Sequence, residues 1–502
     1  MMERVSQHEY LNPGEKTIDY RADRGSEDPR TSNSEVRQRW QKWADQSHQR
    51  ELKYFIPDWD DLVDPRYDFE NERYSNSTGP ADRGSGGWEN EVFAHQLYDT
   101  PSYDGILVSR EVLQKSNKKK EALEELADGN GGVHRYLRVP EDFSVMGDCG
   151  AFGYVNLDEP PYSVDDVLDY YTRHGFNYGI SVDHLVFGAD DQEGKKYRYD
   201  LTLENAKEFY NKHQAQGRKW DPMAAVQGWD IDSYVRAARE CVAIGYDYLA
   251  VGGLVKSTTV EITSVLEAIR DAVGDDIRIH ALGVARFASL RDFLRIGITS
   301  VDSATYLRRA WTSRKDNFWT RDQRVYSAIR IPGPKRSLRT SARKKAEEIA
   351  DKKGMSEEEK EEYKRTRMKE AVKDRLDCAE EMEQECFELL RAYGSHASNA
   401  PSVTELVDRI AQYQDYVGRD CLRQHYTATL QDRPWEQCNC AICERDGIEV
   451  VIFRGNNRNR RRGFHNTRVF YDLLGQVLET GEQISIRRGA DVRPEFSETA
   501  VS

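Results

Sequence analysis

Between about residues 143 and 306 the chain alternates short apolar runs with amphipathic segments. The apolar runs are short enough for strands, and each ends in a polar residue or a glycine. The amphipathic segments carry apolar residues at helical spacing. This alternation predicts βα units and a parallel sheet. The predicted strands cover 143–146, 178–182, 220–226, 248–251, 277–282 and the run that ends at Asp302.

Capping residues place the intervening helices. Ser163 is a suitable N-cap for a helix that closes at Gly175, and Asp232 is the cap that we predict for a helix closing at Gly245. A further helix-like segment over 288–296 precedes the strand of Asp302. Each predicted helix therefore returns the chain to the start of another parallel strand.

Six consecutive strand ends carry polar or small residues: Asp148, Asp183, Gln227, Gly253, Gly283 and Asp302. In a parallel α/β barrel these ends form the reactive face. No Gly-x-Gly-x-x-Gly turn follows the first strand of the run, which favours a closed TIM-like (β/α)8 barrel over an open nucleotide-binding sheet. Asp302 stands where its strand stops, and it is our candidate nucleophile.

The residue types at this face suit a polar heterocycle. Carboxylates accept hydrogen bonds from N–H edges, whereas an amide and backbone N–H groups donate to a carbonyl. Such a set matches a guanine-like base. Any one of these aspartates could instead be a helix cap or a loop carboxylate, but their shared placement favours a common site.

The composition of the chain constrains its function less than these motifs do. The chain has 502 residues, of which 38% are hydrophobic and 32% charged, and its mean hydropathy is −0.80. We expect a globular centre with polar additions. The net charge of −14 argues against bulk attraction to nucleic acid or to anionic membranes, so any such contact needs local basic patches. With no signal peptide and no long apolar run, we expect a soluble, cytoplasmic protein without membrane partners.

Four regions are expected. Residues 1–90 read as a polar N-terminal extension with a flexible loop over 71–87, and 91–330 as the catalytic β/α barrel. Residues 331–430 read as a charged helical insertion, for which a solvated role is favoured over a DNA clamp. Residues 431–502 hold a zinc-binding subdomain and a closing helix.

The cysteine pattern predicts a structural metal site. Cys438, Cys440 and Cys443 form a Cys-x-Cys-x2-Cys cluster, and His465 follows after 21 intervening residues. Three thiolates and one imidazole complete the tetrahedral shell of zinc and leave no open position for catalysis. We therefore predict a structural Zn²⁺.

A run of arginines lies between Cys443 and His465. We expect these side chains to contact nucleic-acid phosphates from a loop beside the metal site, and the alternative is a merely solvated loop. The residues are Arg454, Arg458, Arg460, Arg461 and Arg462.

These motifs resemble the tRNA-guanine transglycosylase superfamily. Asp148-Cys149-Gly150-Ala151-Phe152 is similar to its Asp-Ser-Gly-Gly-Phe/Tyr motif, Val226-Gln227-Gly228 to its Val-Gln-Gly, and Gly252-Gly253-Leu254 to its Gly-Gly-Leu. Asp302 resembles its nucleophile, and the cysteine cluster resembles its zinc knot. The resemblance covers about 40% of the chain, over 143–310 and 438–478.

The chain departs from the tRNA enzymes in several places. A long segment over 315–433 separates the nucleophile from the zinc ligands, and Cys149 replaces the usual Ser. Together with the 53–64 stretch, the pattern looks most like the DNA-modifying, DpdA-like branch, which inserts 7-deazaguanine bases into DNA in restriction-modification systems. A ParB-like helper ATPase is implied only by analogy with that branch.

The resemblance also implies roles. Asp302 would attack C1′ and expel guanine, and 7-cyano-7-deazaguanine (preQ0) would replace it from a flipped-out or single-stranded nucleotide. Asp148 would handle protons. The residues implied to bind the base are Asp183 at its N–H edge, Gln227 and Gly253 at O6, Leu254 beside them, and Phe152 and Leu282 on the ring faces. For Phe152, core packing is the alternative.

Two other functions stay open at this point. A tRNA-directed base exchanger would use the same catalytic residues, so the sequence does not exclude it. A catalytically silent zinc-knot protein, acting as a nucleic-acid scaffold or partner subunit, is the alternative from another class. The presence of Asp148, Asp183 and Asp302 together argues against that second alternative.

Overall fold

A computed structural model describes residues 34–58, 62–78, 82, 84 and 91–489. Its centre is a closed barrel of eight parallel strands in sequence order, which confirms the predicted TIM-like barrel. The barrel closes where β1 pairs with β8, in a register that sets Phe55 against Asp302. The strands are β1 Lys53–Pro57, β2 Gly105–Ser109, β3 Ser144–Asp148, β4 Tyr178–Ile180, β5 Asp221–Val226, β6 Tyr248–Val251, β7 Arg278–Ala281 and β8 Ser300–Asp302.

Helices surround the barrel and are bounded largely by the predicted caps. Ser163 and Asp166 form a capping box at the start of α5, and Gly175 ends that helix with a left-handed φ of 68°. The cap of α7 is Asp230 and not the predicted Asp232, because the Asp230 carboxylate accepts from the backbone N–H of Ser233. These helices are α2 Arg110–Gln114, α3 Asn117–Glu124, α4 Gly132–Leu137, α5 Val164–His174, α6 Gln192–Ala215, α7 Ile231–Ile244, α8 Thr259–Val273, α9 Leu290–Ile296 and α10 Thr305–Thr312.

Alternate residues of each strand face opposite sides of the barrel wall. The inward-facing residues form a small separate core that includes Phe55, Met146, Met223 and Tyr248. The outward-facing residues, such as Ile279 of β7, join the main core beneath the helices. The strand interior is thus filled by side chains, and the polar strand ends are left at one rim.

The predicted boundary at residue 90 is wrong, because β1 lies within the expected N-terminal extension. Helix α1, Ser34–His48, also docks on the body of the protein. Its Trp40 and Trp43 are buried, and the Trp43 indole N–H donates to the carbonyl of Tyr103 at 3.0 Å. Residues 1–33 and much of the predicted 71–87 loop lie outside the described residues.

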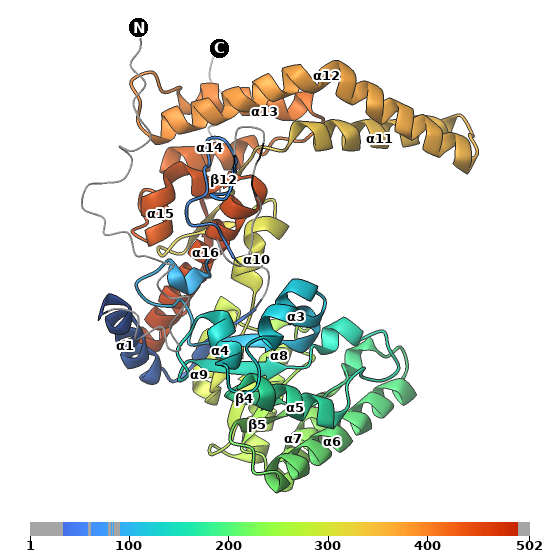
Figure 1. Cartoon of the computed structure of the whole chain (residues 1–502), viewed down its shortest axis with the longest axis vertical. Helices are drawn as coiled ribbons and strands as arrows, with labels where there is room; N and C mark the ends of the chain where they lie inside the picture. Colours follow the sequence, from blue (N-terminus) through green and yellow to red (C-terminus); the bar gives the residue numbers. More distant parts are fainter. Residues whose placement is uncertain (1–33, 59–61, 79–81, 83, 85–90, 490–502) are drawn as a thin grey trace, which may run out of the picture.

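The chain after the barrel builds a second body beside it (Figure 1). Two small sheets, ordered β13-β10-β9 and β11-β12, lie among its helices. The strands are β9 Phe318–Trp319, β10 Arg324–Tyr326, β11 Ile329–Arg330, β12 Ile452–Phe453 and β13 Arg487–Arg488. The helices are α11 Pro334–Lys352, α12 Glu357–Gly394, α13 Val403–Tyr416, α14 Arg423–Asp432, α15 Ala441–Asp446 and α16 Gly455–Thr480.

Two features of this body matter below. Helices α11 and α12 pack along each other and project from the rest of the molecule as an arm (Figure 1). Helix α10, which follows β8 directly, packs along α16 and links the barrel to this body. Within the described residues, every helix is too short or too polar to cross a lipid bilayer.

Candidate functional site

Asp302 ends β8 at the rim of the barrel and is only 5% exposed. Its Oδ1 accepts a hydrogen bond from the backbone N–H of Gly283 at 2.7 Å and lies 3.1 Å from Nε2 of His280. The chain just beyond is fixed as well, because the hydroxyl of buried Tyr54 donates to the carbonyl of Ser303. The carboxylate is therefore held through one oxygen.

A row of buried polar side chains stands behind Asp302. His280 of β7 is opposite Ser300 of β8 in the barrel register, and its Nδ1 lies 2.6 Å from the Ser300 hydroxyl. That hydroxyl lies 2.6 Å from the hydroxyl of Tyr248. When Nδ1 accepts from Ser300, the neutral imidazole carries its proton on Nε2, facing Asp302. In that tautomer His280 presents an N–H donor to the carboxylate.

Asp148 and Asp183 meet at the same rim. Single ligand atoms of Asp148, Cys149 and Asp183 lie within 4.8 Å of one another. Burial raises the pKa of Asp148 to about 7, and the charges of Asp183 and Asp302 act in the same direction. The N–H of Gly150 and the side chain of Ser109 oppose that rise. The charges of Asp183 and Asp302 therefore reach Asp148 across one site.

Asp183 is held by two side chains. Cys149 Sγ lies 3.3 Å from its Oδ1, and the Gln227 amide donates to its Oδ2 at 2.7 Å. Burial raises the pKa of Asp183, and these two bonds oppose the shift. Tyr154 holds Cys149 and Asp183 together, because its hydroxyl contacts Cys149 Sγ and donates to the carbonyl of Asp183.

The turns after β5 and β6 pack closely. Gly253 has a left-handed φ of 78°, and a Cβ there would stand 2.7 Å from the Tyr234 hydroxyl and 3.0 Å from Gln227 Oε1. That Oε1 is buried and has no hydrogen-bond partner among the described residues. The Leu254 side chain is buried in the main core, so its side chain is not available at the rim of the barrel.

Phe152 and Leu282 differ in exposure. Phe152 is 56% exposed and meets the ring of Phe187 at 5.7 Å, so core packing does not explain it. Leu282 is half-buried against the inner core of the barrel. An exposed aromatic ring of this kind can serve as a stacking surface for a planar ligand.

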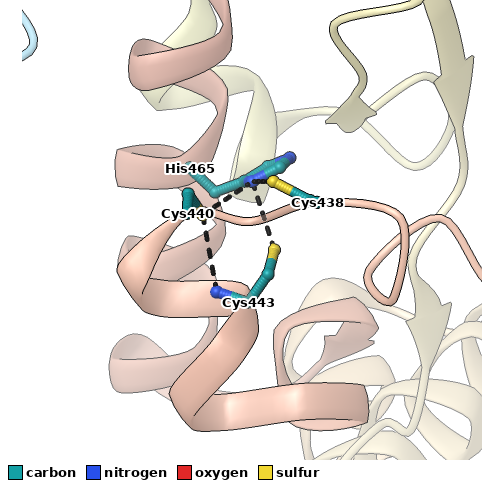
Figure 2. A group of neighbouring side chains, drawn as sticks. All are labelled: Cys438, Cys440, Cys443 and His465. Atoms are coloured by element: carbon teal, nitrogen blue, oxygen red, sulfur yellow. Dashed lines mark hydrogen bonds between the residues drawn. The ribbon is translucent and has the colours of Figure 1, made fainter.

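The four predicted metal ligands come together. Nδ1 of His465 lies 3.7, 3.5 and 3.3 Å from the sulfurs of Cys438, Cys440 and Cys443 (Figure 2). Tetrahedral zinc, with Zn–S near 2.3 Å and Zn–N near 2.0 Å, requires about 3.6 Å between sulfur and nitrogen. Nε2 of His465 lies 2.7 Å from the carbonyl of Trp319, as expected for an oriented ligand. The cluster can hold a metal ion.

The arginine run does not lie in a loop. Arg458, Arg460, Arg461 and Arg462 are on α16, and Arg454 is its N-cap. Arg458, Arg461 and Arg462 are each at most 1% exposed, because they bind protein acceptors. Arg458 pairs with Glu72 and Glu449, Arg461 with Asp446, Arg454 with Glu72 and Glu383, and Arg462 with backbone carbonyls.

Arg460 completes the set by donating to the carbonyl of Leu62 and lying 3.7 Å from Glu91. Buried guanidinium groups that are already paired do not reach a phosphate. We therefore replace the expected phosphate role of this run with a structural one: it ties the chain after β1 to α16.

Sequence reasoning missed His280 and Tyr154. A signal existed for His280, because alternation along 277–282 puts it on the same strand face as Leu282, beside the strand of the nucleophile. Tyr154 offered no comparable signal. Its role depends on how a short 3-10 turn, Ala151–Tyr154, folds back over Asp183.

Comparison with known proteins places this site in a family. No protein-family model matches the sequence. A DNA-guanine transglycosylase from Salmonella montevideo is 34% identical over 444 residues, which make up 85% of this chain and 97% of that relative. This chain belongs to the guanine transglycosylase family. As a guanine transglycosylase it is a pentosyl-transferring enzyme, and the likeness extends over most of both chains.

Proposed function

We propose that this guanine transglycosylase acts on DNA and replaces guanine with a 7-deazaguanine base such as preQ0. The name of the Salmonella montevideo relative supports DNA as the polymer. The observation that carries the proposal is the meeting of Asp148, Asp183 and Asp302 at one rim, with one oxygen of Asp302 held by Gly283 and His280. The other oxygen remains for attack.

In the first half-reaction, Oδ2 of Asp302 attacks C1′ of the target nucleotide. The C1′–N9 bond breaks and its electron pair stays on the purine. Asp148 supplies the proton that makes the leaving guanine neutral, a role that suits a carboxyl group whose pKa is raised to about 7. A glycosyl-aspartate and an ionised Asp148 remain.

In the second half-reaction, ionised Asp148 takes the N9 proton of the incoming 7-deazaguanine. N9 attacks C1′, and the C1′–O bond to Asp302 breaks and restores its carboxylate. Two displacements at C1′ give net retention of configuration, as in retaining glycosidases. Protons and bonds balance without an added cofactor.

Base recognition is assigned to groups around this centre. Asp183 would accept from the N–H edge of the purine, exchanging contacts with Cys149 and Gln227. The Gln227 amide and the backbone N–H of Gly253 would donate to O6, beside the backbone of Leu254. Exposed Phe152 and half-buried Leu282 would cover the faces of the ring.

The metal cluster is assigned to structure. Cys438, Cys440, Cys443 and His465 would hold Zn²⁺ with all four positions filled by protein. The ion would cross-link the turn before α15 to α16, while the His465–Trp319 bond fixes the ligand orientation. It lies outside the group of aspartates and would take no part in base exchange.

The decisive experiment incubates the enzyme with radiolabelled guanine and, separately, DNA or tRNA. We expect label in DNA, and loss of at least about a thousandfold in rate for Asp302→Asn. Label in tRNA alone would support the tRNA-directed alternative, and no label in either would support the non-catalytic one. Base analysis of DNA from cells that express the chain with a preQ0 supply tests the identity of the inserted base.

A further inference from the structure

A cluster of arginines lies at the root of the arm. Arg314 follows α10, Arg330 ends β11, Arg336 is in the first turn of α11, and Arg419 follows α13. Burial lowers the pKa of Arg330, and repulsion from Arg419, Arg314 and Arg336 lowers it further. The four guanidinium groups, which we call the root cluster, therefore share one neighbourhood.

Backbone contacts hold the root cluster together. The Gln414 amide donates to the carbonyl of Arg330 at 2.5 Å, and the N–H of Arg419 donates to the carbonyl of Gln414 at 2.7 Å. Arg314 donates to the carbonyl of Asp420, the residue next to Arg419, at 3.1 Å. These contacts join three of the four chain segments at one packed junction, and Arg336 lies six residues after Arg330.

Little negative charge balances these arginines. Asp420 lies 3.8 Å from Arg314 but is 94% exposed. Arg419 has a buried Nε without a hydrogen-bond partner among the described residues, and the guanidinium of Arg330 lies 5.6 Å from the ring centre of Phe453. By contrast, Arg458 and Arg461 of α16 are paired with the carboxylates of Glu72, Glu449 and Asp446. Like charges gathered without partners are stabilised by a bound anion.

The basic surface continues along α11. Residues 334–345 contain six basic residues and no acidic residue, in a chain whose net charge is −14. All six side chains are exposed, and residues four apart share one face of the helix. We call this row the α11 stripe: Lys335, Arg336, Arg339, Arg343, Lys344 and Lys345.

The root cluster is within reach of DNA bound at the barrel rim. Helix α10 begins at Thr305, three residues after Asp302, and ends at Thr312, two residues before Arg314. One helix of this length with its short flanks spans at most about 30 Å. One turn of duplex DNA is about 34 Å long. A duplex with its target nucleotide at Asp302 is therefore long enough to reach the arm root.

We propose that the root cluster and the α11 stripe form the phosphate-contact surface for duplex DNA flanking the target nucleotide. This proposal rests on the proposed action on DNA and adds the surface that binds the DNA backbone. Guanidinium and ammonium groups along an exposed helix match the regular phosphate spacing of a duplex, and neutralising phosphates releases counterions, so binding depends on salt.

The test replaces arginines with glutamine, which removes the positive charge and keeps a long polar side chain. Arg339→Gln/Arg343→Gln removes two charges from the α11 stripe, and Arg336→Gln/Arg419→Gln removes two from the root cluster. Lys207→Gln/Lys219→Gln is the matched control, because both lysines are exposed away from the arm, one on α6 and one before β5. Each pair is made in the Asp302→Asn background, so that binding is measured without turnover.

Fluorescence anisotropy with a 30-base-pair duplex is recorded over a salt series. For each arm pair we expect about tenfold weaker binding at low salt and a salt slope shallower by about 1.8, as two lost phosphate contacts require. The control pair should bind like its parent. Melting curves that match the parent show that the protein remains folded, and the exposed Arg339/Arg343 pair decides the result if Arg419 affects folding.

Two results would overturn the proposal: arm pairs that bind duplex with the parent's slope, or pairs that lose affinity for tRNA while keeping it for DNA. The proposed function is tested separately: it is wrong if the unmodified enzyme does not exchange bases in DNA. An enzyme that exchanges guanine in DNA while its arm pairs bind normally would contradict this inference alone.

Discussion

At the scale of single residues, the two oxygens of Asp302 are not equivalent. Oδ1 is engaged by the N–H of Gly283 and by Nε2 of His280, whereas the attack that we propose at C1′ would use the other oxygen. Holding one oxygen fixes the plane of the carboxylate, and a fixed near-attack geometry accounts for much of the rate of a displacement. His280 is therefore a positioning residue.

We predict that His280→Ala slows guanine release by about 10- to 100-fold in single-turnover assays, because the carboxylate loses a side-chain donor. DNA affinity should be unchanged. His280→Gln, whose amide can donate from a similar position, should recover part of the rate. A rate for His280→Ala within twofold of the parent would show that Gly283 alone positions the nucleophile.

The raised pKa of Asp148 gives a second prediction. Burial, Asp183 and Asp302 favour its protonated form, so the acid is available below pH 7 and lost as the pH rises through about 7. Single-turnover guanine release should fall over that window, while discharge of the intermediate by an incoming base should rise. In Asp148→Asn both steps should be slow and should lose this dependence. A profile with its midpoint near 4 would assign the titration to an ordinary carboxylate.

At the scale of secondary structure, strand ends were predictable and side-chain partners were not. Asp148, Asp183 and Asp302 could be placed together because parallel strands of a barrel end at one rim. The arginines of α16 could not be placed, since Arg458 binds Glu72, which is 386 positions away. A run of charges looks the same whether it faces water or buried carboxylates. Only the packed structure distinguishes the two.

Helix α16 joins that buried network to the metal cluster, and this leads to a third prediction. The purified protein should contain about one zinc per chain by elemental analysis. Cys440→Ser or prolonged chelation should remove the ion and lower the melting temperature, because the turn before α15 is then no longer tied to α16. Cys378→Ser changes an exposed cysteine of α12 and is the control. Full zinc content in Cys440→Ser would contradict the assignment.

At the scale of the whole molecule, barrel closure depends on a segment that the sequence pattern assigned to an extension. The run 53–57 is short and followed by polar residues, so nothing local marked it as the first strand. In the structure β1 lies between β2 and β8, with Phe55 paired to Asp302. The strand that carries Asp302 therefore needs the N-terminal part of the chain as its neighbour.

We predict that a chain beginning at residue 91 does not form the active site. Without β1 the barrel is left with two open edges, and β8 loses one of its two neighbours. Circular dichroism should show loss of the cooperative thermal transition, and base exchange should be absent. A cooperative transition with activity in this shortened protein would mean that the barrel tolerates an open wall.

Helix α10 has a consequence for where the enzyme sits on its polymer. Helix α10 is a single short helix that packs along α16. It therefore fixes the spacing between Asp302 and Arg314. The helix therefore keeps the arm root at a fixed distance from the reacting nucleotide and on one side of it. Nuclease footprints should then be asymmetric, with the longer protected region always on the same side of the modified base.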